Sequence, residues 1–171
     1  MLEWIPDRPA LSREQSSTVD VLVRLSPPLP TGGKERLAIN VSLVIDNSGS
    51  MTGQRLQLTK RAAILVTKSL TPKDRLSVVL FNNTVSVLVS NTPVLDPSGI
   101  VRLLEGISAG GSTALYDGWK QGAEQATLGQ SKQNLNRVIL LTDGQANVGE
   151  TNPDSICNHV HQCSSQGLQT T

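Results

Sequence analysis

The chain has 171 residues, of which 37% are hydrophobic and 17% charged, and its formal net charge at pH 7 is +1. This length allows one domain with a sizeable core, and the scattered Lys and Arg form no basic cluster of the kind that nucleic-acid binders present. No apolar stretch is long enough to span a membrane. Because aromatic residues make up only 2% of the chain, the core should be aliphatic, which suits a buried parallel sheet.

The first 33 residues are predicted to be an extension that carries one strand. Within residues 18–25, apolar side chains alternate with mostly polar ones, as in a half-exposed strand. Prolines and glycines in residues 26–33 then predict a linker. The main domain is expected to occupy residues 34–171.

From residue 34 onwards, predicted strands alternate with predicted helices. The strands are expected at residues 37–45, 75–81, 85–89 and 137–141, with the start of another at 168–171. The helices are expected at residues 54–70, 98–104, 114–128 and from Pro153 to a stop at Gly167. Such alternation implies right-handed crossovers and a mostly parallel sheet with helices on both faces. The expected fold class is therefore α/β, a three-layer doubly wound, Rossmann-like sheet.

Two local signals refine this architecture. Asn82-Asn83 lies between two apolar strands and is a tight-hairpin signal, so those strands should be antiparallel, with one of them at an edge of the sheet. Gly118 and Gly122 lie four residues apart on a predicted helix, which would let its backbone approach the sheet closely at some cost in helix propensity.

Three loops carry oxygen-bearing side chains where a ligand site would be expected. Asp46, Ser48 and Ser50 follow the most apolar strand, Thr113 lies in a glycine-rich loop before a helix, and Asp143 follows the last long strand. In open α/β sheets, ligands bind beyond the carboxyl ends of the strands. If the 37–45 and 137–141 strands are neighbours, the three loops converge there.

The residue types at these positions predict a metal site. Two carboxylates and three hydroxyls are hard oxygen donors, which favour Mg²⁺, with Mn²⁺ or Ca²⁺ as alternatives, over zinc. Since the hydroxyls add coordination without negative charge, the metal would stay electron-poor and ready to accept an incoming carboxylate.

These residues also resemble a known family. Asp46-x-Ser48-x-Ser50, a lone Thr113 and Asp143 in Thr-Asp-Gly look like the metal-ion-dependent adhesion site of von Willebrand factor A domains. Stretches such as Asp-Arg-Leu-Ser-Val-Val-Leu-Phe and Val-Ile-Leu-Leu-Thr-Asp-Gly agree with the family in order and spacing. The resemblance covers roughly residues 38–171 and is strongest to the bacterial and inter-alpha-trypsin-inhibitor-like branch.

The resemblance implies a function and a role for each residue. Ser48, Ser50 and Thr113 would coordinate the ion directly. Asp46 and Asp143 would do so directly or through water, with a Glu or Asp of a partner protein completing the shell. The implied function is divalent-cation-dependent protein–protein interaction without catalysis. A complete family domain has further strands and a helix after residue 171, so the chain is expected to be truncated, with an uncovered sheet edge that invites self-association.

Three other interpretations compete with the metal site. Asp46, Ser48 and Ser50 could simply cap a helix. A Mg²⁺-dependent phosphatase or other hydrolase would need a general acid or base two residues after Asp46. That position holds Ser48, so there is no obvious residue for acid–base catalysis. A scaffold could also retain the motif without using it.

The cysteines and histidines near the C-terminus are predicted to be structural. His159 and His161 would face nearly opposite ways on a helix, which argues against zinc, and Ile156, Cys157, Val160 and Cys163 read as a buried apolar stripe. Two unpaired thiols and the absence of a visible signal peptide favour a cytoplasmic over an extracellular location.

Overall fold

The computed structural model describes residues 2–6, 21–25, 36–144 and 147–171, which divide into two compact units, Met1–Arg36 and Leu37–Thr171. In the first unit, β1 (Leu2–Pro6) pairs antiparallel with β2 (Val21–Leu25). One strand was predicted in this unit, and the described residues form two. Residues 18–20 and the predicted linker at 26–33 lie outside the described residues.

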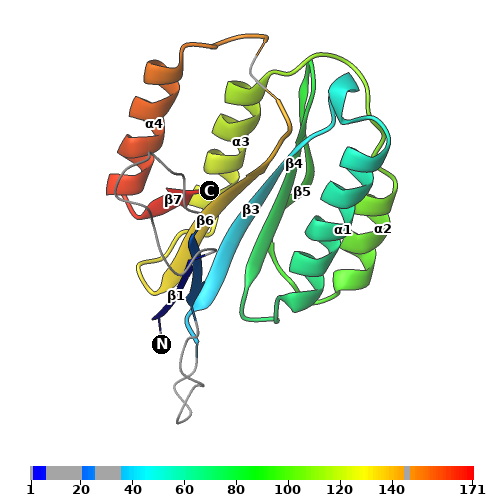
Figure 1. Cartoon of the computed structure of the whole chain (residues 1–171). Helices are drawn as coiled ribbons and strands as arrows, with labels where there is room; N and C mark the ends of the chain where they lie inside the picture. Colours follow the sequence, from blue (N-terminus) through cyan, green and yellow to red (C-terminus); the bar gives the residue numbers. More distant parts are fainter. Residues whose placement is uncertain (1, 7–20, 26–35, 145–146) are drawn as a thin grey trace, which may run out of the picture. The chain divides into compact units, whose positions relative to one another are not determined.

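Within the described residues of the second unit, one sheet contains five strands in the order β5-β4-β3-β6-β7 (Figure 1). The strands are β3 (Ala38–Asp46), β4 (Arg75–Phe81), β5 (Val85–Pro93), β6 (Asn134–Leu141) and β7 (Leu168–Thr170). The helices are η1 (Gly49–Met51), α1 (Gln54–Ser69), α2 (Pro97–Glu105), α3 (Leu115–Leu128) and α4 (Pro153–Ser165). Only the β4–β5 pair is antiparallel among these described strands. The predicted fold class and the predicted hairpin are confirmed.

The sheet lies between two helical layers, with α1 and α2 on one face and α3 and α4 on the other (Figure 1). Successive side chains of a strand point to opposite faces. Leu43 and Ile45 of β3 therefore pack in one buried cluster with Leu56 of α1, whereas Val44 packs in a second cluster with Trp119 of α3. Both faces of β3 are buried, as its mostly apolar sequence predicts.

Two glycines bring α3 against the sheet. A Cβ atom built on Gly118 would lie 2.5 Å from Cγ of Phe81, and one on Gly122 would lie 2.1 Å from Cγ2 of Val44. Real side chains do not approach so closely, so a larger residue at either position would push the helix outward. The close approach predicted from the glycine spacing is confirmed.

The last helix and strand differ in part from expectation. Asn152 caps α4 by accepting hydrogen bonds from the backbone N–H groups of Asp154 and Ser155. Val160 and Cys163 pack against the α3-side cluster, but Cys157 is exposed, so the predicted stripe is wrong at that position. α4 lies at the margin of the sheet (Figure 1). None of its residues is fully buried, and only part of its surface packs against the domain.

β7 pairs with β6, which confirms the predicted start of a further strand at residues 168–171 and covers part of the sheet edge that was expected to be open. Asn136 to Val138 lie opposite Leu168 to Thr170, and the N–H of Leu140 donates to the carbonyl oxygen of Thr171 at 2.8 Å. Gly167, with φ of 88°, makes the turn that leads α4 into this strand. None of the helices in the described residues has the length and hydropathy to cross a membrane.

Two buried serines on adjacent strands lead to a stability prediction. Ser42 of β3 and Ser77 of β4 are register partners, and neither side-chain oxygen has a hydrogen-bond partner among the described residues. Because a buried hydroxyl without a partner has lost its bonds to water, we expect Ser77→Ala to raise the free energy of unfolding by about 1 kcal/mol. Urea denaturation measures this. The exposed Ser69→Ala is the control, and a loss of stability in Ser77→Ala alone would contradict the prediction.

Candidate metal site

The predicted site residues lie at the carboxyl-terminal edge of the sheet. Asp46 is the last residue of β3, and Asp143 follows β6 after one intervening residue. β3 and β6 are parallel neighbours in which Ile45 lies opposite Leu141. The condition for convergence of the loops is therefore met, and the pairing brings the two acidic loops to the same place.

Asp46 is completely buried and is held through both carboxylate oxygens. Its Oδ1 accepts a hydrogen bond from the backbone N–H of Ser48 at 2.8 Å, and its Oδ2 accepts one from Oγ1 of Thr142 at 2.6 Å. Because one donor comes from its own loop and the other from the loop after β6, this carboxylate links the two loops. Its orientation is therefore fixed before any ligand binds.

The hydroxyls of two serines extend this network of hydrogen bonds towards the surface. Oγ of Ser48, which is buried, lies 3.0 Å from Oγ of the exposed Ser50. Oγ of Ser50 in turn donates to Oδ1 of Asp143 at 3.1 Å. Four of the five predicted ligands are thus joined by consecutive hydrogen bonds, from the buried Asp46 to the accessible Asp143.

Thr113, the fifth predicted ligand, is buried and is held near the others through backbone contacts. The N–H of Gly49 donates to the carbonyl oxygen of Gly111 at 2.9 Å, and the N–H of Gly110 donates to that of Asn47 at 2.8 Å. The N–H of Thr113 donates to Oδ1 of Asn147 at 2.8 Å. The Thr113 loop is therefore fastened both to the Asp46–Ser50 loop and to the loop that carries Asp143.

Helix capping does not explain these residues. Ser48 precedes η1 and Gly53 precedes α1, and neither helix start has a capping hydrogen bond from its N-cap side chain. Asp46 and Ser50 direct their side-chain oxygens to Thr142, Ser48 and Asp143 instead. The oxygens face one another across the loops.

The donors present fit a hard divalent cation. Two carboxylates lie among hydroxyls, and the described residues include no group of three or more His, Cys, Asp or Glu side chains that could form a metal site. A site with two acids and several neutral oxygens suits Mg²⁺ better than a soft transition metal. Asp143 already contacts a cation within the chain, since Nη1 of Arg55 forms an ion pair with its Oδ2.

Comparison with known proteins identifies the family. Residues 41–145 match the sequence profile of the von Willebrand factor type A domain, and this segment contains all five predicted ligands. The chain belongs to the von Willebrand factor A (vWA) family. Members of this family commonly serve as protein-interaction modules.

Relatives of this vWA domain occur in bacteria and animals. The chain is 36% identical over 115 residues to sll0103 of Synechocystis sp., covering 67% of this chain and 27% of that protein. It is 33% identical over 134 residues to human inter-alpha-trypsin inhibitor heavy chain H4 (72% and 14%) and 32% identical over 153 residues to YfbK of Escherichia coli (88% and 25%). The chain therefore spans only a small part of each of these proteins.

Solved structures share the fold. BatB from Bacteroides thetaiotaomicron superposes with a TM-score of 0.63 at 20% identity, covering 78% of this chain and 65% of that one. Proximal thread matrix protein 1 of the mussel byssus was solved with zinc occupying its metal-ion-dependent adhesion site (MIDAS) motif. It gives a TM-score of 0.66 at 19% identity, covering 78% of this chain and 37% of that one. At such identities the agreement concerns the fold.

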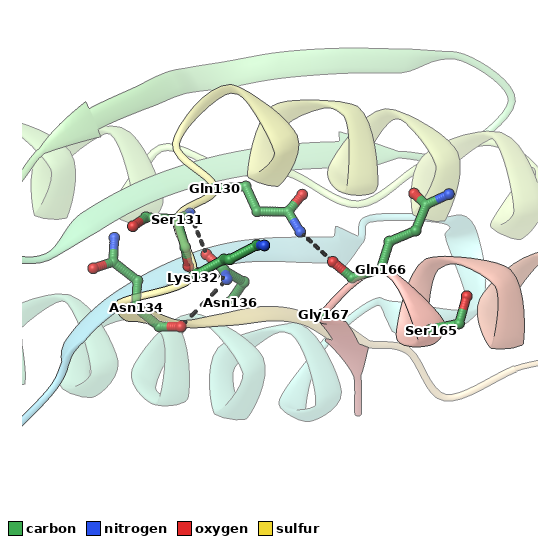
Figure 2. Close-up of a pocket in the computed structure, with 8 residues that line it drawn as sticks. All are labelled: Gln130, Ser131, Lys132, Asn134, Asn136, Ser165, Gln166 and Gly167. Carbon is green, nitrogen blue, oxygen red and sulfur yellow. Dashed lines mark hydrogen bonds between the residues drawn. The ribbon is translucent and has the colours of Figure 1, made fainter.

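The described part of this vWA domain also has a polar pocket of about 570 Å³ away from the predicted ligands (Figure 2). It is lined by Gln130, Ser131, Lys132, Asn134, Asn136, Ser165, Gln166 and Gly167. Several of these groups bind one another, such as Nε2 of Gln130 to the carbonyl oxygen of Gln166 at 2.7 Å. The pocket lies where β6 and β7 begin, at the opposite edge from the site.

Three residues that support the site were not identified as functional from the sequence. Thr142 binds Asp46, Asn147 binds the Thr113 loop, and Arg55 pairs with Asp143. Thr142 belongs to the quoted Thr-Asp-Gly motif, which is a local signal. Arg55 and Asn147 had no such signal, because their partners are far away in the sequence.

Proposed function

We propose that this vWA domain binds a divalent cation, Mg²⁺ in the first place, and uses it to bind a carboxylate of a partner protein. The observation that carries this proposal is the series of hydrogen bonds that joins Asp46 to the backbone N–H of Ser48, the hydroxyl of Ser48 to that of Ser50, and Ser50 to Asp143. Mn²⁺ and Ca²⁺ share the preference for such oxygens. The zinc-occupied MIDAS motif in the mussel protein is consistent with a metal at this position in the fold.

The five residues would have two different roles at the metal. Asp46 and Asp143 would supply negative charge, while Ser48, Ser50 and Thr113 would supply neutral oxygens. A bound Mg²⁺ supplies Lewis acidity that attracts a carboxylate. Because Asp46 is buried and Asp143 is accessible, with 17% of its side chain exposed, the partner would approach from the Asp143 side.

We propose binding rather than catalysis for this site. The position two residues after Asp46 is Ser48, whose hydroxyl lies beside Ser50. Among the hydrogen bonds of the described site, neither hydroxyl has a histidine partner, and the one carboxylate that Ser50 contacts, Asp143, is paired with Arg55. General acid–base chemistry at these hydroxyls would have to use that paired carboxylate. A phosphatase assay with Mg²⁺ tests this point, since turnover that Asp46→Asn abolishes would favour the hydrolase alternative.

A metal titration tests the proposal directly. We expect isothermal titration calorimetry to show one Mn²⁺ site that Mg²⁺ competes for and that EDTA empties. Ser50→Ala removes a predicted ligand and the hydrogen bond to Asp143, so we expect it to weaken Mn²⁺ binding by at least about tenfold. The control Ser69→Ala removes an exposed hydroxyl at the far end of α1 and should bind as the wild type does. Equal affinities in both variants would reject the proposed ligand set.

A further inference from the structure

We propose that Arg55 tunes the metal site by competing with the cation for Asp143, so that the loaded site retains a net positive charge that selects an anionic partner. This inference rests on the proposed function, because it concerns the same metal site. It assigns to Arg55 a positioning and specificity role that lies outside the set of metal ligands.

The contacts of Arg55 show why it is placed to compete. Its Nη1 forms an ion pair with Oδ2 of Asp143 and also donates to the carbonyl oxygen of Ser50 at 3.2 Å. Oδ1 of the same Asp143 accepts from Oγ of Ser50. Both oxygens of the accessible carboxylate are thus engaged within the chain, and one of them is engaged by a cation.

The two carboxylates of the site differ in this respect. Asp46 is held by neutral donors, the N–H of Ser48 and the hydroxyl of Thr142, which leave its charge available to a metal. Asp143 is held by a full positive charge. A divalent ion that binds near Asp143 must therefore overcome repulsion from Arg55 or displace its guanidinium from the carboxylate.

Arg55 is exposed enough to be displaced. Its side chain is 63% exposed, and it lies at the second position of α1, one turn from the loop of Ser50. The charged residues of α1 are Arg55, Lys60, Arg61 and Lys68, all of them basic. The helix itself therefore offers Arg55 no acidic partner, and Asp143 is the carboxylate that holds it in the structure.

A charge count shows what Arg55 changes. Asp46 and Asp143 carry two negative charges, so a divalent ion alone would make the site neutral. With Arg55 nearby, the loaded site has a net charge of about +1, and one incoming carboxylate neutralises it. Arg55 thus weakens the binding of the metal alone and strengthens the binding of an anion to the loaded site.

Arg55→Gln tests this with two readouts of opposite sign. Calorimetric titration with Mn²⁺ in sodium chloride should show affinity about threefold to tenfold higher than in the wild type, given the exposure of the pair and screening by salt. Repeating the titration in sodium acetate at equal ionic strength, corrected for Mn²⁺–acetate complexes, measures the coupling between metal and carboxylate. Acetate should raise Mn²⁺ affinity less in Arg55→Gln than in the wild type.

Two matched variants make the test specific. Arg61→Gln removes the same charge from an exposed position of α1 and should leave both readouts near wild type. Arg55→Lys keeps the charge and should retain most of the acetate effect. Thermal melting without metal checks that each variant is folded.

The failure of this inference and the failure of the proposed function give different results. If the wild type binds Mn²⁺ in a manner that depends on Asp46, but Arg55→Gln shows unchanged or weaker Mn²⁺ binding, or an unchanged acetate effect, the role of Arg55 is overturned. If the wild type shows no Mn²⁺ binding that depends on Asp46, the proposed function is overturned, and the role of Arg55 is overturned with it.

Discussion

Replacing Asp46 with alanine is expected to abolish Mn²⁺ and Mg²⁺ binding and also to lower the free energy of unfolding by about 2–3 kcal/mol. Asp46 is fully buried, and its carboxylate accepts hydrogen bonds from the N–H of Ser48 and the hydroxyl of Thr142. Alanine would leave both donors without an acceptor inside the protein. The loss of stability should appear in urea denaturation carried out in EDTA, where no metal contributes.

Asp46→Asn should separate the two effects. The amide has nearly the same shape as the carboxylate, and its oxygen still accepts from the N–H of Ser48. Its NH₂ group can donate to the hydroxyl of Thr142, which then acts as acceptor. We therefore expect Asp46→Asn to lose metal binding, because the charge is gone, while keeping a stability within about 1 kcal/mol of the wild type in EDTA. Wild-type Mn²⁺ affinity in Asp46→Asn would show that this carboxylate is not a ligand.

The fold was predictable because its signals are local and repeated. β3 and β4 are mostly aliphatic, with few polar residues, which is how a strand buried on both faces appears in a sequence. The Asn82-Asn83 turn correctly indicated the antiparallel pair at β5. α4 was harder, because it lies at the margin of the sheet. Cys157 occupies an apolar position in the pattern but is exposed.

The candidate ligands of the site could be predicted from the sequence, but the residue that pairs with Asp143 could not. Asp46, Ser48 and Ser50 are close in sequence, and the topology of parallel strands brings Asp143 beside them. Arg55 could not be predicted, because its partner Asp143 lies 88 residues away and a solvent-exposed arginine near a helix start has many other roles. Its contact depends on how α1 is placed against β6, which no local pattern contains.

Gly122→Ala is expected to destabilise the domain by about 1–2 kcal/mol although alanine is the better helix former. In an exposed helix this change would gain about 1 kcal/mol. Here the new Cβ would lie 2.1 Å from Cγ2 of the fully buried Val44. Relieving such a contact requires a shift of α3 or a strained rotamer, at a cost of about 1–3 kcal/mol that exceeds the gain. Gly122→Leu should cost about 4 kcal/mol or more, a large fraction of a domain's stability.

Gly99→Ala is the matched control for this effect. Gly99 lies in the first turn of α2, and its nearest neighbour to a new Cβ is Oδ2 of Asp96 at 3.8 Å, an ordinary contact. The same substitution should therefore stabilise the domain by about 0.5–1 kcal/mol. If close packing of α3 is the cause, urea denaturation should show a lower free energy of unfolding for Gly122→Ala and a higher one for Gly99→Ala. A change in the same direction in both variants would contradict this explanation. Since α3 follows directly after the Thr113 loop, Gly122→Ala should also weaken Mn²⁺ binding, whereas Gly99→Ala should leave it unchanged.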